Sequence, residues 1–295
     1  MPEDSHHHQH HHGHHHNHGD GAHHTDNVAF TEANRTHWND FASQYTSEPW
    51  QRDLLNKVTA FIHQHINWIG VDFLDPATTF EISSPTSKTK RQVRVLDYAC
   101  GPGTITYALA ARGTEYIGID LSENMVKAYN VRFNPDPINA ANTSPADGTA
   151  AQDDKLDETL NAHAVVGNLL DPEDPSPSHL SSPEFFNFDL VVVGLGYHHF
   201  QDIPLATNRL VERLRPGGIF LILDFVTHAM EKSSDPAQQQ LPTHTVAHAG
   251  FSEEELRSYF ESAGLTDFSI VKMDGEVLLR GEAKRRPFLA RGQKL

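Results

Sequence analysis

Two acidic residues each follow an apolar run, at the position where a buried strand is expected to end. Asp97 follows the run at 93–96 and precedes a segment of small residues, 99–103, while Asp120 follows the run at 116–119. The glycines of the small-residue segment would let a ligand approach the backbone where a Cβ would fill the space. A carboxylate at the second strand end can accept hydrogen bonds from both hydroxyls of a ribose. The spacing therefore predicts a loop that binds a nucleoside-containing cofactor.

The dinucleotide-binding motif is incomplete in this loop. From Gly101 the chain reads Gly-Pro-Gly-Thr-Ile-Thr, so Thr106 occupies the place of the third glycine in G-x-G-x-x-G. Asp97 would repel a diphosphate but attract an ammonium group. The segment resembles motif I of class I S-adenosylmethionine-dependent methyltransferases, acid-x-Gly-x-Gly-x-Gly, with Ala99 in place of the first glycine. An ordinary strand-to-helix turn without a ligand is the alternative interpretation.

The resemblance, which is to type-11-like methyltransferase domains, implies S-adenosylmethionine as the cofactor and assigns a role to each loop. Asp97 would hold the methionine ammonium group, Asp120 the ribose, and Met125 would face the adenine. Asn168 stands where family members often carry an acid that contacts the adenine amino group. The cofactor-binding residues expected from the resemblance are Tyr45, Asp97, Ala99, Gly101, Gly103, Asp120, Leu121, Met125, Asn168, Leu169 and Leu195. No metal ligand is assigned.

Two adjacent histidines, His198 and His199, follow the apolar strand expected at 188–193. In the family this loop lies beside the transferred methyl group. Adjacent side chains there cannot both face a pocket, so one imidazole is the candidate base if the methyl acceptor is a hydroxyl or an acidic carbon. The alternative is that both histidines only shape the loop and the helix that Asp202 would cap.

The elements that must position these residues alternate between strand and helix. Apolar runs predict strands near 93–97, 116–120, 163–166, 188–194, 219–224, 268–273 and 287–292. Cap residues predict helices after Ser122, Asp202 and Ser252. By resemblance the fold is α/β and Rossmann-like, with a seven-stranded, mostly parallel sheet and a carboxy-terminal antiparallel hairpin.

The domain boundaries follow from composition. Residues 1–26 contain 12 of the 22 histidines and few apolar residues, so we expect a disordered His-rich tail over 1–35 that could bind metal ions loosely or could be an expression tag. A methyltransferase domain would fill 36–295. It would include amino-terminal lid helices near 38–45 and 49–68 and polar insertions near 134–161 and 171–186.

Charge and cysteine content limit the partners. The net charge of −16 argues against binding to nucleic acid or to an anionic membrane, and the single Cys100 cannot form an internal disulfide. No apolar run is long enough for membrane insertion. We expect a cytoplasmic protein, with the nucleus as a second compartment.

The methyl acceptor is not identified by the sequence, and three hypotheses are compatible with it. The first is a small-molecule hydroxyl, amine or acidic carbon, which the lid helices and the two histidines favour. The second is a protein, including one linked to chromatin, methylated by this chain or by a complex in which it is a regulatory subunit. A looser resemblance to fungal regulatory methyltransferases of the VapB kind suggests such a protein partner. The third is a binding scaffold with a vestigial cofactor site.

Overall fold

A seven-stranded sheet forms the centre of the computed structural model, which describes residues 20–45, 47–76, 92–135, 160–228, 245–280 and 282–295. Its strands run in the order β3-β2-β1-β4-β5-β9-β6. All neighbouring pairs are parallel except those made by β9, which is antiparallel to both β5 and β6. This arrangement confirms the predicted fold class. The strands are β1 (Arg94–Tyr98), β2 (Glu115–Asp120), β3 (Ala162–Val166), β4 (Phe188–Gly194), β5 (Leu214–Phe225), β6 (Leu265–Lys272) and β9 (Pro287–Lys294).

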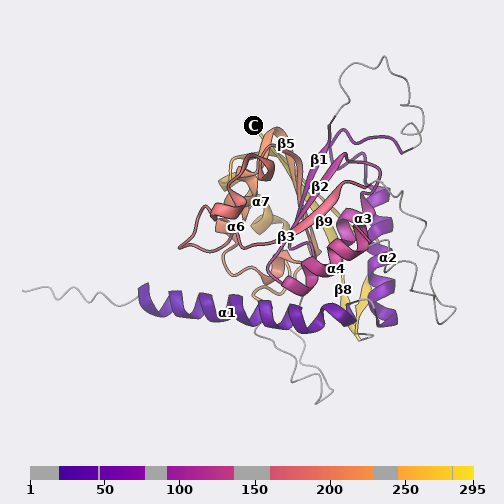
Figure 1. Ribbon diagram of the computed structural model, residues 1–295. Helices are drawn as coiled ribbons and strands as arrows, with labels where there is room; N and C mark the ends of the chain where they lie inside the picture. Colours follow the sequence, from indigo (N-terminus) through magenta and orange to yellow (C-terminus); the bar gives the residue numbers. More distant parts are fainter. Residues whose placement is uncertain (1–19, 46, 77–91, 136–159, 229–244, 281) are drawn as a thin grey trace, which may run out of the picture.

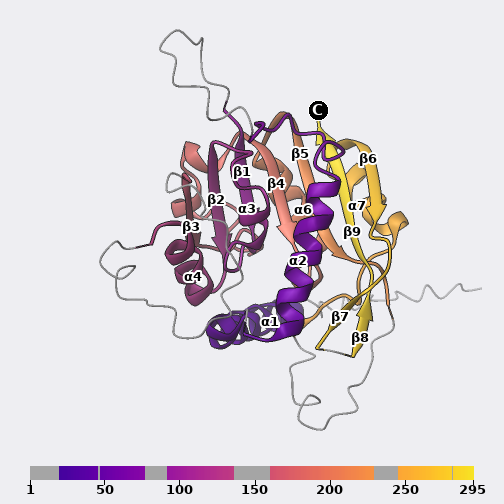
Figure 2. The ribbon, with the colours of Figure 1, turned by 90° about the vertical axis from the view of Figure 1, so that its right-hand side faces the viewer.

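Helices cover both faces of the sheet, and one long helix lies across its end. Figures 1 and 2 show α2, α3 and α4 on one face and α6 and α7 on the other, while α1 crosses the end at which the parallel strands finish. A separate two-stranded ribbon, β7 (Val277–Leu279) with β8 (Ala283–Arg285), lies beside the main sheet. The helices are α1 (Asp20–Phe41), α2 (Pro49–Gln64), α3 (Thr104–Ala108), α4 (Glu123–Phe133), α6 (Ile203–Glu212) and α7 (Glu253–Ser262), and the short 3₁₀ helices are η1 (Ala42–Gln44), η3 (Ser178–Leu180), η4 (Pro183–Phe185) and η5 (Tyr197–His199).

The central strands are apolar throughout because helices cover both of their faces. In β4, Leu190 and Val192 belong to the core under α2, α3 and α4, whereas Val191 and Val193 belong to the core under α6 and α7. All four side chains are fully buried. Each contributes about 1.5 to 3 kcal/mol through burial. This packing fixes the strand ends from which the candidate site is built.

The helices next to the site begin at the predicted cap residues. Ser122 Oγ accepts a hydrogen bond from Met125 N at 3.1 Å, and Asp202 Oδ1 accepts one from Leu205 N at 2.8 Å. Ser252 forms the predicted capping box with Glu255 at the start of α7. Since each cap satisfies a backbone N–H that has no partner within the helix, each stabilises its helix by about 1 kcal/mol.

One expectation needs correction. Helix α1 begins at Asp20, so residues 20–35 of the expected disordered tail are helical. Tertiary contacts described below hold this helix, and composition alone did not reveal them. The polar insertion predicted at 171–186 is mostly exposed but packs on the core at two points, since Leu180 and Phe185 are buried and the buried Arg213 donates through Nη1 to Leu180 O at 2.5 Å.

Two sequence expectations fall partly outside the described residues. These are residues 1–19 of the tail and residues 136–159 of the first insertion. In the part of the chain that the structure describes, no helix combines the length and the apolar character needed to cross a bilayer.

Candidate functional site

The loops after β1 and β4 meet at the carboxyl end of the sheet and contain unusual backbone conformations. Ala99, after β1, and Leu195, after β4, have φ angles of 54° and 59°. Non-glycine residues adopt this left-handed region at an energetic cost, and such residues concentrate at functional sites. A Cβ added to Gly196 would lie 3.0 Å from the Ala99 Cβ, so the two loops are in close contact. A cavity lies against this contact and is lined by Ala99, Leu195 and Gly196 among others.

Asp120, the last residue of β2, lines the cavity and is only 9% exposed. Its Oδ2 accepts a hydrogen bond from Gly101 N and its Oδ1 accepts one from Ser122 N, both at 2.8 Å. Burial raises the pKa of this carboxyl to about 6 despite these hydrogen bonds. Each carboxylate oxygen keeps acceptor capacity, so Asp120 can still bind two hydroxyl groups of a ligand.

Asp97 lies behind the cavity wall and does not line it. Its Oδ2 accepts hydrogen bonds from Thr106 N at 3.2 Å and from Thr106 Oγ1 at 2.9 Å. Thr106, which replaces the third glycine of the dinucleotide motif, therefore anchors the start of α3 to the end of β1. Within the described part of the chain Oδ1 of Asp97 has no hydrogen-bond partner, and burial raises the pKa of this carboxyl to about 7.

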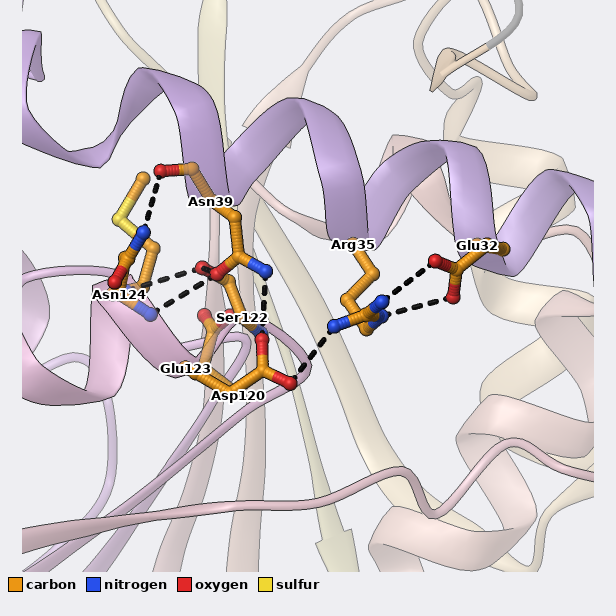
Figure 3. Close-up of polar contacts among 8 residues, drawn as sticks. Glu32, Arg35, Asn39, Asp120, Ser122, Glu123 and Asn124 are labelled. Carbon is orange, nitrogen blue, oxygen red and sulfur yellow. Dashed lines mark hydrogen bonds and ion pairs between the residues drawn. The ribbon is translucent and has the colours of Figure 1, made fainter.

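Helix α1 covers the cavity and is attached beside Asp120. Asn39 Oδ1 accepts hydrogen bonds from Ser122 Oγ at 2.6 Å and from Asn124 N at 3.0 Å, as Figure 3 shows. Asn39 Nδ2 donates to Glu123 Oε2 at 2.7 Å, and Arg35 pairs with the other oxygen of Glu123 at 2.8 Å. Because Ser122 also donates its backbone N–H to Asp120, this group of contacts joins the helix over the cavity to the carboxylate inside it.

The two histidines of η5 have different environments. The Nδ1 of His198 lies 2.8 Å from Oδ1 of the fully buried Asp224, whose Oδ2 accepts the His198 backbone N–H at 3.0 Å. His199 lines the cavity, and its Nδ1 donates to the Thr245 carbonyl. Burial of the imidazole, and to a smaller extent the neighbouring His198, lowers the pKa of His199 well below 6.5. His199 is therefore neutral at neutral pH, with a proton on Nδ1 and a free electron pair on Nε2.

The structure brings most of the predicted site residues together at this cavity. Those that line it are Tyr45, Ala99, Gly101, Asp120, Leu121, Met125, Asn168, Leu195 and His199.

Four predicted residues do not line the cavity: Asp97, Gly103, Leu169 and His198. A Cβ added to Gly103 would come within 2.9 Å of the Tyr129 and Phe133 rings, so this glycine permits packing against α4. Leu169 is fully buried, and its N–H donates to Tyr98 Oη at 3.0 Å. His198 is held by Asp224, as described above. We assign Gly103, Leu169 and His198 to the support of the cavity wall.

One face of α1 was missed as part of the site. Asn27, Phe30, Thr31, Asn34 and Trp38 all line the cavity. Their spacing of three or four residues is that of a single helical face and was the available signal. It was overlooked because the preceding histidines led to the expectation of a disordered segment. The other cavity residues not predicted as site residues are Tyr98, Leu170, Gly194, Gly196, Phe200, Gln201 and Asp202.

The strand order and the cavity at the strand ends define a class I methyltransferase domain. The chain belongs to the methyltransferase domain family, whose match covers residues 73–270. It is 28% identical over 188 residues to an uncharacterized methyltransferase of Schizosaccharomyces pombe, a match that covers 62% of this chain and 56% of that relative.

Two solved structures of magnesium protoporphyrin IX methyltransferase from Synechocystis PCC 6803 share the fold. The structure with bound S-adenosylmethionine gives a TM-score of 0.52 at 13% identity, covering 90% of this chain and 97% of that one. The structure with bound S-adenosylhomocysteine gives a TM-score of 0.50 at 14% identity, covering 90% of this chain and 99% of that one.

Proposed function

We propose that the protein transfers the methyl group of S-adenosylmethionine to a hydroxyl, amine or acidic carbon of a small molecule. The observation that carries the proposal is a cavity covered by α1, with the Asp120 carboxylate and the neutral His199 imidazole both in its lining. The family of the domain supports the reaction class. The helix over the cavity favours an acceptor small enough to be enclosed.

The residues of the cavity fit this cofactor. Asp120 offers acceptor capacity to the ribose hydroxyls. A Cβ placed on Gly101 would meet no atom of the described residues within 4 Å, so the space beside this glycine is open to a ligand. The unpartnered Oδ1 of Asp97 suits a nearby ammonium group, reached directly or through water. When bound, S-adenosylmethionine supplies an activated methyl group. The cavity residues then have to hold the acceptor in line with that group, which is the main source of rate in such a transfer.

His199 is the candidate base. Its Nδ1 proton is used in the hydrogen bond to Thr245, so Nε2 is the nitrogen that can accept a proton. For a hydroxyl acceptor, Nε2 would take the hydroxyl proton while the oxygen gains the methyl group. General-base help of this kind is worth roughly 10² to 10⁴ in rate. His198, held by Asp224, would position the loop that carries His199.

The proposal is tested by incubating the protein with labelled S-adenosylmethionine and a cell extract, and then separating protein from small molecules. We expect label in the small-molecule fraction. The Asp120→Ala variant is the control, because loss of the ribose acceptor should abolish incorporation. Label confined to the protein fraction would contradict the proposal and favour a protein acceptor.

A further inference from the structure

The side chain of Asn34 on α1 has an unmet hydrogen-bonding requirement in the wall of the cavity. The residue is only 6% exposed, it lines the cavity, and its Oδ1 has no hydrogen-bond partner among the described residues. Its Nδ2 donates to the Phe30 carbonyl at 3.2 Å. This contact fixes the amide orientation, since the reversed amide would place two acceptors against each other. A buried acceptor without a donor destabilises the protein unless a ligand supplies the donor.

The position of Asn34 places it on the acceptor side of the cavity. One helical turn further along, Trp38 packs edge-on against His199 with ring centroids 5.2 Å apart. Residues 34 and 38 share a face of α1, so Asn34 faces the wall formed by the loop after β4. The residues expected to hold the cofactor lie on a different wall: Asp120 ends β2 and Met125 follows it in α4.

The remaining lining restricts the charge and shape of the ligand. Phe30, Trp38 and Phe200 supply aromatic surfaces around this part of the cavity. None of the described residues that line the cavity is Lys or Arg, while Asp120 and Asp202 are both present. A carboxylate or phosphate would therefore lose its hydration without gaining a counter-charge. Aromatic walls with an unpartnered acceptor fit a planar molecule that carries a hydrogen-bond donor for this acceptor.

We infer that the methyl acceptor is an uncharged aromatic molecule whose O–H or N–H group donates a hydrogen bond to Asn34 Oδ1. This inference rests on the proposed function and narrows its substrate class. Asn34 is a positioning and specificity residue in this scheme. The O–H or N–H group that it binds is distinct from the group that is methylated, and the proton that leaves the methylated group goes to Nε2 of His199.

The experiment uses three probes with the same ring system. Naphthol carries a donor, methoxynaphthalene carries none, and naphthoate is an anion. Their affinities are measured at neutral pH on the full chain saturated with S-adenosylhomocysteine. We expect naphthol to bind about tenfold more tightly than either of the others, which corresponds to one hydrogen bond to a buried acceptor. Equal or tighter binding of naphthoate would overturn the inference without any variant.

The Asn34→Leu variant then tests whether the preference for naphthol depends on Asn34. We expect the preference for naphthol over methoxynaphthalene to disappear, while the affinity for S-adenosylhomocysteine stays unchanged. The same substitution at the exposed Asn208 on α6 is the matched control. If the variant still prefers naphthol, the inference is overturned. If it also binds S-adenosylhomocysteine more weakly, Asn34 is assigned to the cofactor instead. Should the Leu variant be poorly folded, Asn34→Ser is measured instead, with the same two outcomes. Failure of the parent protein to bind S-adenosylhomocysteine would overturn the proposed function as well, so the two failures are distinguishable.

Discussion

Burial changes the acid–base properties of Asp120 in a way that ligand binding should reverse. The pKa of about 6 reflects loss of hydration, and hydrogen bonds from ribose hydroxyls would favour the charged carboxylate and lower that pKa. Binding of S-adenosylhomocysteine near pH 6 should therefore release about half a proton from this residue. Calorimetry in two buffers with different ionisation enthalpies measures the release, and it should vanish near pH 8, where Asp120 is already ionised.

The variant Asp120→Asn tests whether the released proton comes from this carboxyl or from another group. It should lose the proton release assigned to Asp120 and bind S-adenosylhomocysteine about tenfold or more weakly, because a charged acceptor is replaced by a neutral one. Asp53→Asn, on the exposed face of α2, is the control and should behave like the parent. An unchanged affinity in Asp120→Asn would remove the ribose assignment.

The tautomer of His199 leads to a prediction about turnover. His199→Gln keeps a polar side chain but lacks the Nε2 base, so turnover should fall about tenfold or more with cofactor affinity unchanged. Because burial lowers the pKa of His199 well below 6.5, the parent enzyme should keep its rate as the pH falls through that value and lose it only at lower pH. Steady-state rates across pH test this, with the exposed His179→Gln as control. A full rate in His199→Gln would leave positioning alone as the mechanism.

At the scale of elements, the attachment of α1 should govern ligand exchange. Asn39→Ala removes the hydrogen bonds that Asn39 accepts from Ser122 Oγ and the Asn124 backbone N–H and the one that it donates to Glu123. The packing of Trp38 against His199 is left intact. We expect faster dissociation of S-adenosylhomocysteine and faster amide hydrogen exchange in 27–41, with little change in the thermal midpoint. Thr36→Ala, on the exposed face of the same helix, is the control. Unchanged exchange in both variants would show that the other contacts of α1 are sufficient.

The elements also show what the sequence could and could not predict. Strand positions and the caps at Ser122 and Asp202 were predicted because they depend on local periodicity and local hydrogen bonds. Only the end of helix α1 was predicted, as part of the lid helix near 38–45. Residues 20–35 were not, since attachments such as the ion pair of Arg35 with Glu123 join positions far apart in the chain. Asp97 was predicted to line the site because its sequence position is that of a cofactor contact. Whether its carboxylate reaches the cavity depends on Thr106, which only the folded structure reveals.

For the whole molecule, the buried acids make stability depend on pH. Asp97 is 1% exposed, and burial raises its pKa from 3.8 to about 7. Between these two pH values the carboxyl of Asp97 is protonated in the folded state and ionised in the unfolded state. Its contribution to the free energy of unfolding is therefore fully present at low pH and is lost as the pH rises through 7. At neutral pH and above the loss is roughly 2 to 4 kcal/mol.

We therefore expect Asp97→Asn to be more stable than the parent above about pH 7, since the amide stays neutral, and to approach it below about pH 4. Thermal midpoints of the ligand-free proteins across this range test the difference. Asp189→Asn, a partly buried acid paired with Arg215 at the opposite end of β4, is the control and should gain nothing at high pH. A difference between parent and Asp97→Asn that does not vary with pH would contradict the linkage.

Strand β9 lies between β5 and β6, although both precede it in the chain. During synthesis β5 (Leu214–Phe225) and β6 (Leu265–Lys272) are therefore made before the strand that pairs with both of them. Until β9 is made, each has an unpaired backbone edge. Most of β5 is apolar and buried in the finished sheet, so its exposed edge during synthesis is open to pairing with other nascent chains. We therefore expect the yield of native protein in a cell to depend on how quickly residues 287–294 emerge and insert.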